Sequence, residues 1–138
     1  PLTGELTIAS AGHPPLLIYH ARTQSCTRYK PRGMPLGVKD SSPEYTLEYA
    51  AVEAGDIVLL YTDGLIEQGV ILGQEFGLDR IERILCNLAK LPAHEISEAL
   101  LAELEKHAGR MRIQSFDDDI AFVIMKITDE AKKYPQQS

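Results

Sequence analysis

Acidic residues in two distant stretches of the chain could together form a metal site. Asp63 follows an apolar run, within the segment Tyr-Thr-Asp-Gly-Leu-Ile-Glu at positions 61–67. Asp117, Asp118 and Asp119 stand together directly before a second apolar run. Carboxylates held close together repel one another unless a cation lies between them. Oxygen donors without Cys or His favour a hard ion, magnesium or manganese, over zinc.

Strand pairing could bring the two stretches together. The apolar run 57–61 ends just before Asp63, and the run 120–127 begins just after the aspartate triplet. If these runs are antiparallel strands of one sheet, their acidic ends meet at the same edge, with neighbouring strands ~4.8 Å apart. Gly64 fits a metal site there, because a residue without Cβ lets backbone and solvent approach an ion beside Asp63.

Each acidic segment also has an ordinary structural interpretation. Asp-Gly between apolar runs is a strong signal for a hairpin turn, so Asp63 and Gly64 could simply reverse the chain. An aspartate triplet before a strand is commonly a solvated loop that caps or bends the chain. Residue types alone leave both interpretations open, and it is the combination of the two segments that favours a metal site.

The first half of the chain consists of short apolar runs separated by turn residues, which is typical of strands. The runs 6–10 and 16–19 flank Gly-His-Pro-Pro and suggest a hairpin or a bulged pair. A strand is expected over 45–52. The run 57–61 lacks alternation, which indicates a central strand covered on both faces. A sheet buried on both faces needs another layer on each side.

The second half is predicted to be helical. One apolar stripe and then another recur at helical spacing, and they comprise Leu78, Ile81, Ile84, Leu85 and Leu88, then Ile96, Leu100, Leu101 and Leu104 after Pro92. His94 and His107 are predicted on polar helix faces, and Arg80 and Arg83 on a solvated face. A final strand over 120–127 completes an α+β layered domain.

Composition bounds the class of protein. The chain has 138 residues, 44% of them hydrophobic and 25% charged, which is ordinary for a globular domain. A net charge of −6 without a basic stripe argues against a nucleic-acid partner. No apolar run reaches the ~20 residues that span a bilayer. Cys26 in a polar loop and Cys86 in an apolar helix are predicted to be free thiols in a reducing cytoplasm.

Several segments, in order, resemble the SpoIIE-like branch of the PPM (protein phosphatase 2C-like) family. The segment Ala-Gly-His-Pro-Pro at 11–15 is similar to a family hairpin, and Gly-Met-Pro-Leu-Gly at 33–37 resembles a family loop. The most specific match is 55–67, which resembles the pattern Gly-Asp-x4-Tyr-Thr-Asp-Gly-x2-Glu. Glu-Phe-Gly at 75–77 and Asp-Asp-Ile at 118–120 complete the set. The resemblance covers residues 6–127.

The resemblance implies an antiparallel β-sandwich flanked by helices in α-β-β-α layers, with a two-metal centre at one sheet edge. It implies residues 1–128 as a partial phosphatase domain, with 129–138 as a polar tail. The reaction would be hydrolysis of phosphoserine or phosphothreonine on a bacterial regulatory protein, such as an anti-anti-sigma factor, by metal-activated water. Asp63 and Asp118 resemble the catalytic metal ligands. The metal set would be Asp63, Gly64, Asp118 and, if the register is shifted, Asp119.

The same resemblance implies cofactors and partners. Two divalent ions, manganese or magnesium, would serve the intact domain, and a sensory or receiver domain would lie upstream in a cytoplasmic or membrane-tethered protein. Glu67 could steer a metal-bound water or serve as a plain surface residue. His13 is a tempting general acid, but its rigid Gly-His-Pro-Pro setting favours a structural role in which the imidazole bonds to backbone.

One departure from the family pattern affects the functional expectation. Nothing in the sequence resembles the family's first metal motif, Asp-x-x-Gly-His-Gly. We therefore expect this chain, which begins at Pro1, to be a segment that is inactive alone. We also expect an exposed apolar edge that permits a homodimer. The rival functions are a non-catalytic pseudo-phosphatase that binds or senses a partner, a different acidic-site metal hydrolase, and a structural domain whose Asp-Gly is a turn.

Overall fold

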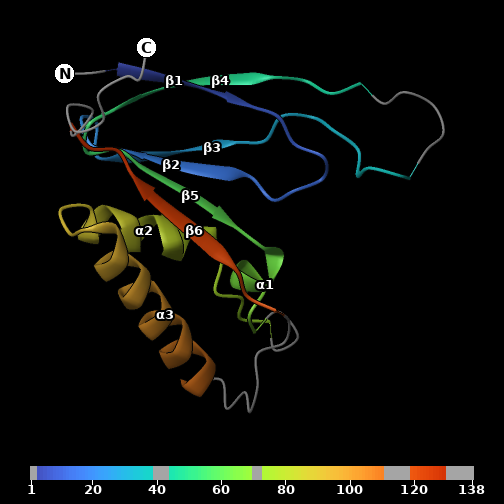
Figure 1. The fold of residues 1–138 in the computed structure, drawn as a ribbon. Coiled ribbons are helices and arrows are strands. Elements are labelled where there is room, and N and C mark those ends of the chain that lie inside the picture. The colour runs from blue at the N-terminus through green and yellow to red at the C-terminus, as the bar shows by residue number, and fades with distance from the viewer. Residues whose placement is uncertain (1–2, 39–43, 70–72, 111–118, 130–138) are drawn as a thin grey trace.

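The computed structural model describes residues 3–38, 44–69, 73–110 and 119–129. Within these ranges the chain forms three layers (Figure 1). A two-stranded sheet lies over one face of a four-stranded sheet, and helices cover the other face. This arrangement of antiparallel sheets and helices confirms the predicted α+β class. No helix in the described part of the chain combines the length and apolarity needed to cross a bilayer.

The two sheets are antiparallel throughout. In the first, β1 (Thr3–Ile8) pairs with β4 (Glu48–Glu53). The order of the second is β3 (Ser25–Tyr29), β2 (Leu16–His20), β5 (Ile57–Tyr61) and β6 (Phe122–Lys126). The expected hairpin between the first two strands is therefore wrong, because β1 and β2 belong to different sheets. Thr3 instead faces Glu53, fifty residues along the chain, and the segment between β1 and β2 crosses from one sheet to the other.

Strand β5 is a central strand, as predicted, with β2 on one side and β6 on the other. Its alternate residues Ile57, Leu59 and Tyr61 join the core beneath the helices and are at most 2% exposed. Val58 points the other way and packs with Ala50 of β4 in the core between the sheets. Burial on both faces explains the apolar run from Ile57 to Leu59, whereas Leu60 is 38% exposed.

The helices are α1 (Asp63–Ile66), α2 (Leu78–Leu88) and α3 (Ala93–Arg110). The fully buried members of the predicted stripes in α2 and α3 are Ile81, Leu85, Ile96, Leu100 and Leu104. Leu101 departs from the expected stripe, since it is 41% exposed. Beyond the end of α2, the ammonium of Lys126 in β6 donates to the carbonyls of Ala89 and Leu91, at 2.7 and 2.6 Å. A cation there satisfies carbonyls that the helix leaves unpaired.

Asp56 closes the turn between β4 and β5. Its buried carboxylate accepts hydrogen bonds from the backbone N–H groups of Ala21, at 2.8 Å, and Glu53, at 3.1 Å. His20 Nδ1 lies 3.4 Å from Oδ2 of the same carboxylate. The Gly-Asp pair in the sequence therefore shapes the start of β5, where Asp56 has a structural role.

Candidate functional site

Asp63 stands at the junction of β5 and α1. The strand ends at Tyr61, Thr62 is extended, and Asp63 begins the short helix. The side chain of Asp63 is exposed, and its Oδ1 accepts a hydrogen bond from the backbone N–H of Gly64 at 3.1 Å. Within the described ranges Asp63 makes no ion pair with a Lys, Arg or His. The hairpin interpretation of Asp-Gly is wrong, because the pair opens a helix and reverses no strand.

The predicted pairing of the two acidic strands is confirmed. Strands β5 and β6 are antiparallel neighbours, with Tyr61 opposite Phe122. Continuing this register by two residues brings the chain to Asp63 on one side and Ile120 on the other. Asp119 therefore lies at the same end of the sheet as Asp63. Asp117 and Asp118 fall outside the described residues.

Thr62 fastens the two acidic stretches together. Its hydroxyl accepts from the backbone N–H of Ala121 at 3.0 Å and donates toward the carbonyl of Asp119 at 3.2 Å. Its backbone N–H donates to the carbonyl of Ala121 at 2.9 Å. Sequence reasoning did not single out Thr62. Its position between the buried strand and Asp63 was the available signal, because a hydroxyl there can bond a neighbouring strand end.

The donors that the structure brings to this edge suit a hard divalent ion. Asp63 offers carboxylate oxygens, Asp119 follows on the neighbouring strand, and no Cys or His of the described chain joins them in a metal-binding group. Within the described residues no three His, Cys, Asp or Glu side chains are grouped closely enough to hold a metal alone. The chemistry of the donors fits magnesium or manganese, which bind through few carboxylates and keep several waters.

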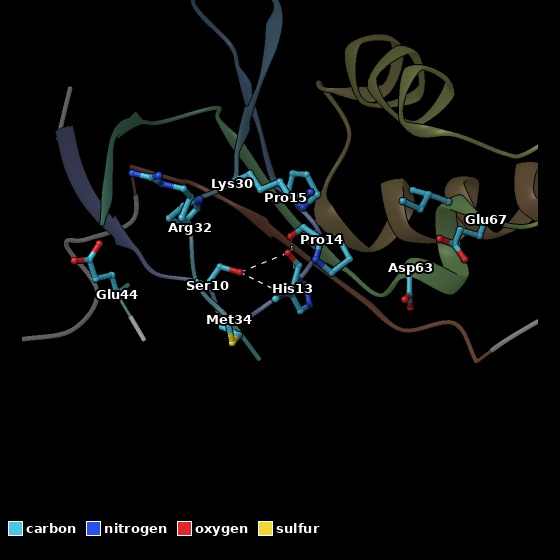
Figure 2. A pocket seen from close by; sticks show the side chains of 14 residues that line it. Ser10, His13, Pro14, Pro15, Lys30, Arg32, Met34, Glu44, Asp63 and Glu67 are labelled. Atoms are coloured by element: carbon cyan, nitrogen blue, oxygen red, sulfur yellow. Dashed lines mark hydrogen bonds between the residues drawn. The ribbon is translucent and has the colours of Figure 1, made fainter. Parts of the chain in front are cut away.

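A cleft of about 930 Å³ opens beside Asp63. Figure 2 shows its walls: Asp63 and Glu67 project from α1 on one side, and Lys30 and Arg32 come from the segment after β3 on the other. His13 lies between them. Glu67, an exposed residue at the end of α1, thus faces the same space as Asp63, which suits either of the roles predicted for it.

Two glycines allow the loops of this cleft to pack against each other. Gly33 has no room for a side chain, because a Cβ there would lie 1.8 Å from the carbonyl oxygen of Ser10. Gly12 adopts a φ of 85° and a Cβ there would lie 2.7 Å from the Pro35 ring. Both positions require glycine. The two motif loops that the sequence placed 20 residues apart therefore form one wall.

His13 bonds backbone, as predicted. Its Nδ1 lies 3.0 Å from the carbonyl of Pro14, and its backbone N–H donates to the Ser10 hydroxyl at 3.1 Å. The ring is exposed and lines the cleft. His13 thus has a structural bond through one ring nitrogen while the ring borders the space next to Asp63.

His107 supports the segment that follows α1. It is 6% exposed, and its Nε2 lies 3.0 Å from the carbonyl of Gln74 while its Nδ1 lies 2.6 Å from the Arg80 guanidinium. Arg80 also stacks over Phe76, whose ring contacts His107 edge-on. The predictions that His107 lies on a polar face and Arg80 on a solvated one are wrong, because loop carbonyls and an aromatic ring cover that side of the helices.

Several known proteins resemble this chain in sequence or in fold. The family model for stage II sporulation protein E (SpoIIE) matches residues 1–128. The structure of the PP2C phosphatase domain and a fragment of the regulatory domain of SpoIIE from Bacillus subtilis matches with a TM-score of 0.69 and 20% identity, over 89% of this chain and 34% of that one. No curated protein matches the chain.

Two further structures share the fold. The RsbU and RsbW domains of Rv1364c from Mycobacterium tuberculosis match with a TM-score of 0.59 and 23% identity, over 90% of this chain and 32% of that one. The SpoIIE phosphatase domain from Bacillus subtilis, presoaked with manganese, matches with a TM-score of 0.63 and 18% identity, over 96% and 59%. The chain thus spans about a third to three-fifths of the proteins it matches.

Proposed function

Because the chain belongs to the SpoIIE family and has the fold of its PP2C-type phosphatase domains, we propose that it is part of a metal-dependent protein serine/threonine phosphatase. The observation that carries the proposal is the edge where β5 meets β6. Antiparallel pairing and the Thr62 hydroxyl hold Asp63 and the Asp119 backbone at one end of the sheet, beside an open cleft. The manganese-presoaked relative supports a metal at such a site.

The metal ligands proposed are Asp63, Asp118 and Asp119, with Gly64 leaving space for the ion. Bound manganese or magnesium would supply Lewis-acid chemistry for attack of water on a phosphate ester. This chain's own residues hold the ligands in place: Thr62 ties the two strand ends, and the Gly64 N–H orients the Asp63 carboxylate. Glu67 faces the same cleft and is proposed to orient water there.

The shape of the cleft supports a protein substrate. It is wide and lies at the surface, so that a phosphorylated side chain on a folded partner could enter it. Lys30 and Arg32 are exposed cations on its far wall, opposite Asp63 and Glu67. Cations attract phosphoryl groups and acidic flanking residues. We propose a phosphorylated bacterial regulatory protein, such as an anti-anti-sigma factor, as the substrate class, with a sensory or receiver domain upstream.

The test is manganese-dependent hydrolysis of a phosphoserine peptide by the parent phosphatase domain and by three variants, Asp63→Asn, Asp118→Asn and Asp119→Asn. Asp63→Asn and Asp118→Asn are expected to lower kcat/KM by about 10²-fold or more, since each removes a charged ligand from the ion. Glu98→Gln, an exposed carboxylate on α3 far from the cleft, is the matched control. Unchanged rates in both ligand variants would refute the assigned roles.

The same assay separates the rival function. The 138 residues contain no Asp-x-x-Gly-His-Gly segment, so the chain alone is expected to show negligible turnover. A parent domain that also fails to hydrolyse phosphopeptides with either ion, while still binding a partner, would identify a non-catalytic pseudo-phosphatase module.

A further inference from the structure

Two thiols from distant parts of the sequence meet where β3 packs on α2. Cys26 is half-buried in β3 and packs against the core beneath the helices, whereas Cys86 is exposed on α2. The two thiols are near enough to interact, since Cys86 is one of the groups that raise the pKa of the Cys26 thiol. The Cys86 thiol also lies 3.9 Å from the carbonyl of Gln24, just before β3. The sequence had suggested separate settings, with Cys26 in a polar loop, and that interpretation is wrong because β3 is a paired strand.

The ion pairs beside the cysteines show how the strand and the helix are aligned. Arg28 in β3 binds Glu82 and Asp79 of α2, each at 2.6 Å. Moving two residues along a strand advances ~6.6 Å, and moving four residues along a helix advances ~6 Å. A step of two residues along β3 and a step of four along α2 therefore cover similar distances, which places Cys26 near Cys86 just as Arg28 lies near Glu82.

Tyr19 lies beside the same junction of β3 and α2. It is the residue opposite Cys26 in the neighbouring strand β2. Its pKa is raised, first by burial and then by Cys86 and Cys26, so that both thiols lie near its hydroxyl. Two cysteines that face each other from separate elements can form a disulfide where their Cβ atoms come within ~3.5–4.5 Å of each other.

We propose that Cys26 and Cys86 form a reversible disulfide that links β3 to α2 when the protein is exposed to a peroxide. In the first step the Cys86 thiol takes one oxygen from hydrogen peroxide, which becomes water, and Cys86 becomes a sulfenic acid. In the second step the Cys26 sulfur attacks the Cys86 sulfur. The S–S bond forms, the S–O bond breaks, and the hydroxyl leaves with the Cys26 proton as a second water. Two electrons pass from the thiols to the peroxide.

The order of attack follows from exposure. Cys86 is open to solvent, so a small oxidant reaches it first. Burial and the neighbouring Cys86 raise the pKa of the Cys26 thiol to about 12. The thiolate is the reactive form of cysteine, so Cys26 reacts slowly with free peroxide. The high pKa also slows attack of Cys26 on a sulfenic acid, so Cys26 resolves Cys86 only because the fold holds the two thiols close together. The pair is independent of the proposed phosphatase chemistry.

The experiment oxidises the reduced 138-residue chain with hydrogen peroxide, blocks free thiols with N-ethylmaleimide, and identifies linked peptides by mass spectrometry. The expected product is a monomer that has lost two hydrogens, carries no maleimide and contains a peptide joining Cys26 to Cys86. Dithiothreitol should restore two alkylatable thiols. Complete alkylation of both thiols after oxidation, or disulfides only between separate chains, would overturn the proposal.

The matched control moves the thiol to the next helix position. Cys86→Ser combined with Asn87→Cys places the second thiol about 100° around the helix at an exposed position. Linkage to Cys26 is expected to be slowed at least ~10-fold, because the folded chain no longer holds the thiols together. Linkage that is equally fast in the control, or equally fast in concentrated urea, would show that the fold contributes nothing.

A second measurement follows the folded state directly. The link closes a long loop of the chain, so oxidation of the native pair should raise Tm by about 5 °C or more. The same treatment of Cys86→Ser should leave Tm unchanged. A Tm that falls on intramolecular oxidation would mean that the link distorts the junction, and this also counts against the proposal.

Discussion

The two faces of the four-stranded sheet differ in how well they are covered. On the face beneath the helices, Leu59 is fully buried and Tyr61 nearly so. On the face toward the two-stranded sheet, Leu60 is 38% exposed, and Val123 and Met125 of the neighbouring strand are 54% and 43% exposed. These residues alternate along the same two strands. The contrast therefore comes from the layers above and below, and not from the strands themselves.

The position of the uncovered part explains the difference. Pairing of β1 with β4 supplies a cover for Ile18 of β2 and for Val58 of β5. Across β5 and β6 the described residues cover Leu60, Val123 and Met125 less completely. The sequence predicted an exposed apolar sheet edge, whereas the exposed apolar residues described here lie on a sheet face. Exposed apolar patches commonly mark places where another chain or segment packs.

Leu59 and Leu60 provide the sharpest test, because they are the same residue type at adjacent positions on opposite faces. Leu59→Ala should lower the free energy of unfolding by about 3 kcal/mol, since it leaves a cavity under the helices. Leu60→Ala should cost less than about 1 kcal/mol, because much of its surface is already in water. Urea denaturation monitored by circular dichroism measures both.

The loss of stability in Leu60→Ala also shows whether another chain or segment covers the partly open face in solution. Equal losses for the two variants would contradict the contrast and would indicate that the face is covered in solution. If a second copy of the chain provides the cover, the loss for Leu60→Ala should grow with protein concentration. If a longer parent protein provides it, the loss should be larger in the parent domain than in the 138-residue chain.

Substitution of Lys126 tests how much its hydrogen bonds stabilise the covered face. Along β6 it follows Phe122 and Ile124 on the helix side, and it donates to two carbonyls beyond the end of α2. Lys126→Met keeps an apolar stem of similar length but removes the donors, and is expected to cost about 1–2 kcal/mol of unfolding free energy. Lys90→Met, at an exposed lysine between the two acceptor residues, is the control and should have little effect. Equal losses would mean that the two bonds contribute nothing specific.

Sequence alone predicted the strands and helices that carry strong apolar patterns. The buried run of β5 and the stripes of α2 and α3 are visible because burial requires apolar residues at fixed spacing. The metal-site prediction required β5 and β6 to be antiparallel strands of one sheet, and the structure shows that they are. The assignment of Asp118 as a ligand stays a prediction.

Other features depend on contacts between distant segments, and no local pattern encodes them. The partner of β1 is β4, because the chain between β1 and β2 changes sheet. His107 is buried because carbonyls of Gln68 and Gln74 accept its bonds, so a polar residue type gives no sign of burial. Cys26 lies in an outer strand of polar sequence, which resembles a loop when taken alone.

Tyr61 is the covered-face residue with the smallest expected effect. It is 2% exposed, and its hydroxyl has no hydrogen-bond partner among the described residues. A buried hydroxyl without a partner is unfavourable, while the ring contributes packing. Tyr61→Phe should therefore change the free energy of unfolding at neutral pH by less than about 1 kcal/mol, and in the stabilising direction.

Stability at alkaline pH distinguishes the contribution of the Tyr61 hydroxyl from that of the other residues on the covered face. Burial raises the pKa of Tyr61 from 10.0 to about 12. The folded state therefore holds the phenol proton more tightly than the unfolded state, so this contribution is fully present below pH 10 and is lost as pH rises toward 12.

Urea titrations at a series of pH values should show a shallower alkaline loss in Tyr61→Phe than in the wild type. Part of the loss should remain in Tyr61→Phe, because the pKa of Cys26 is also raised to about 12. Tyr49→Phe, at a 60% exposed position, should follow the wild type. Identical alkaline curves for Tyr61→Phe and the wild type would mean that solvent reaches the Tyr61 hydroxyl, and that the face beneath the helices is not closed at this position.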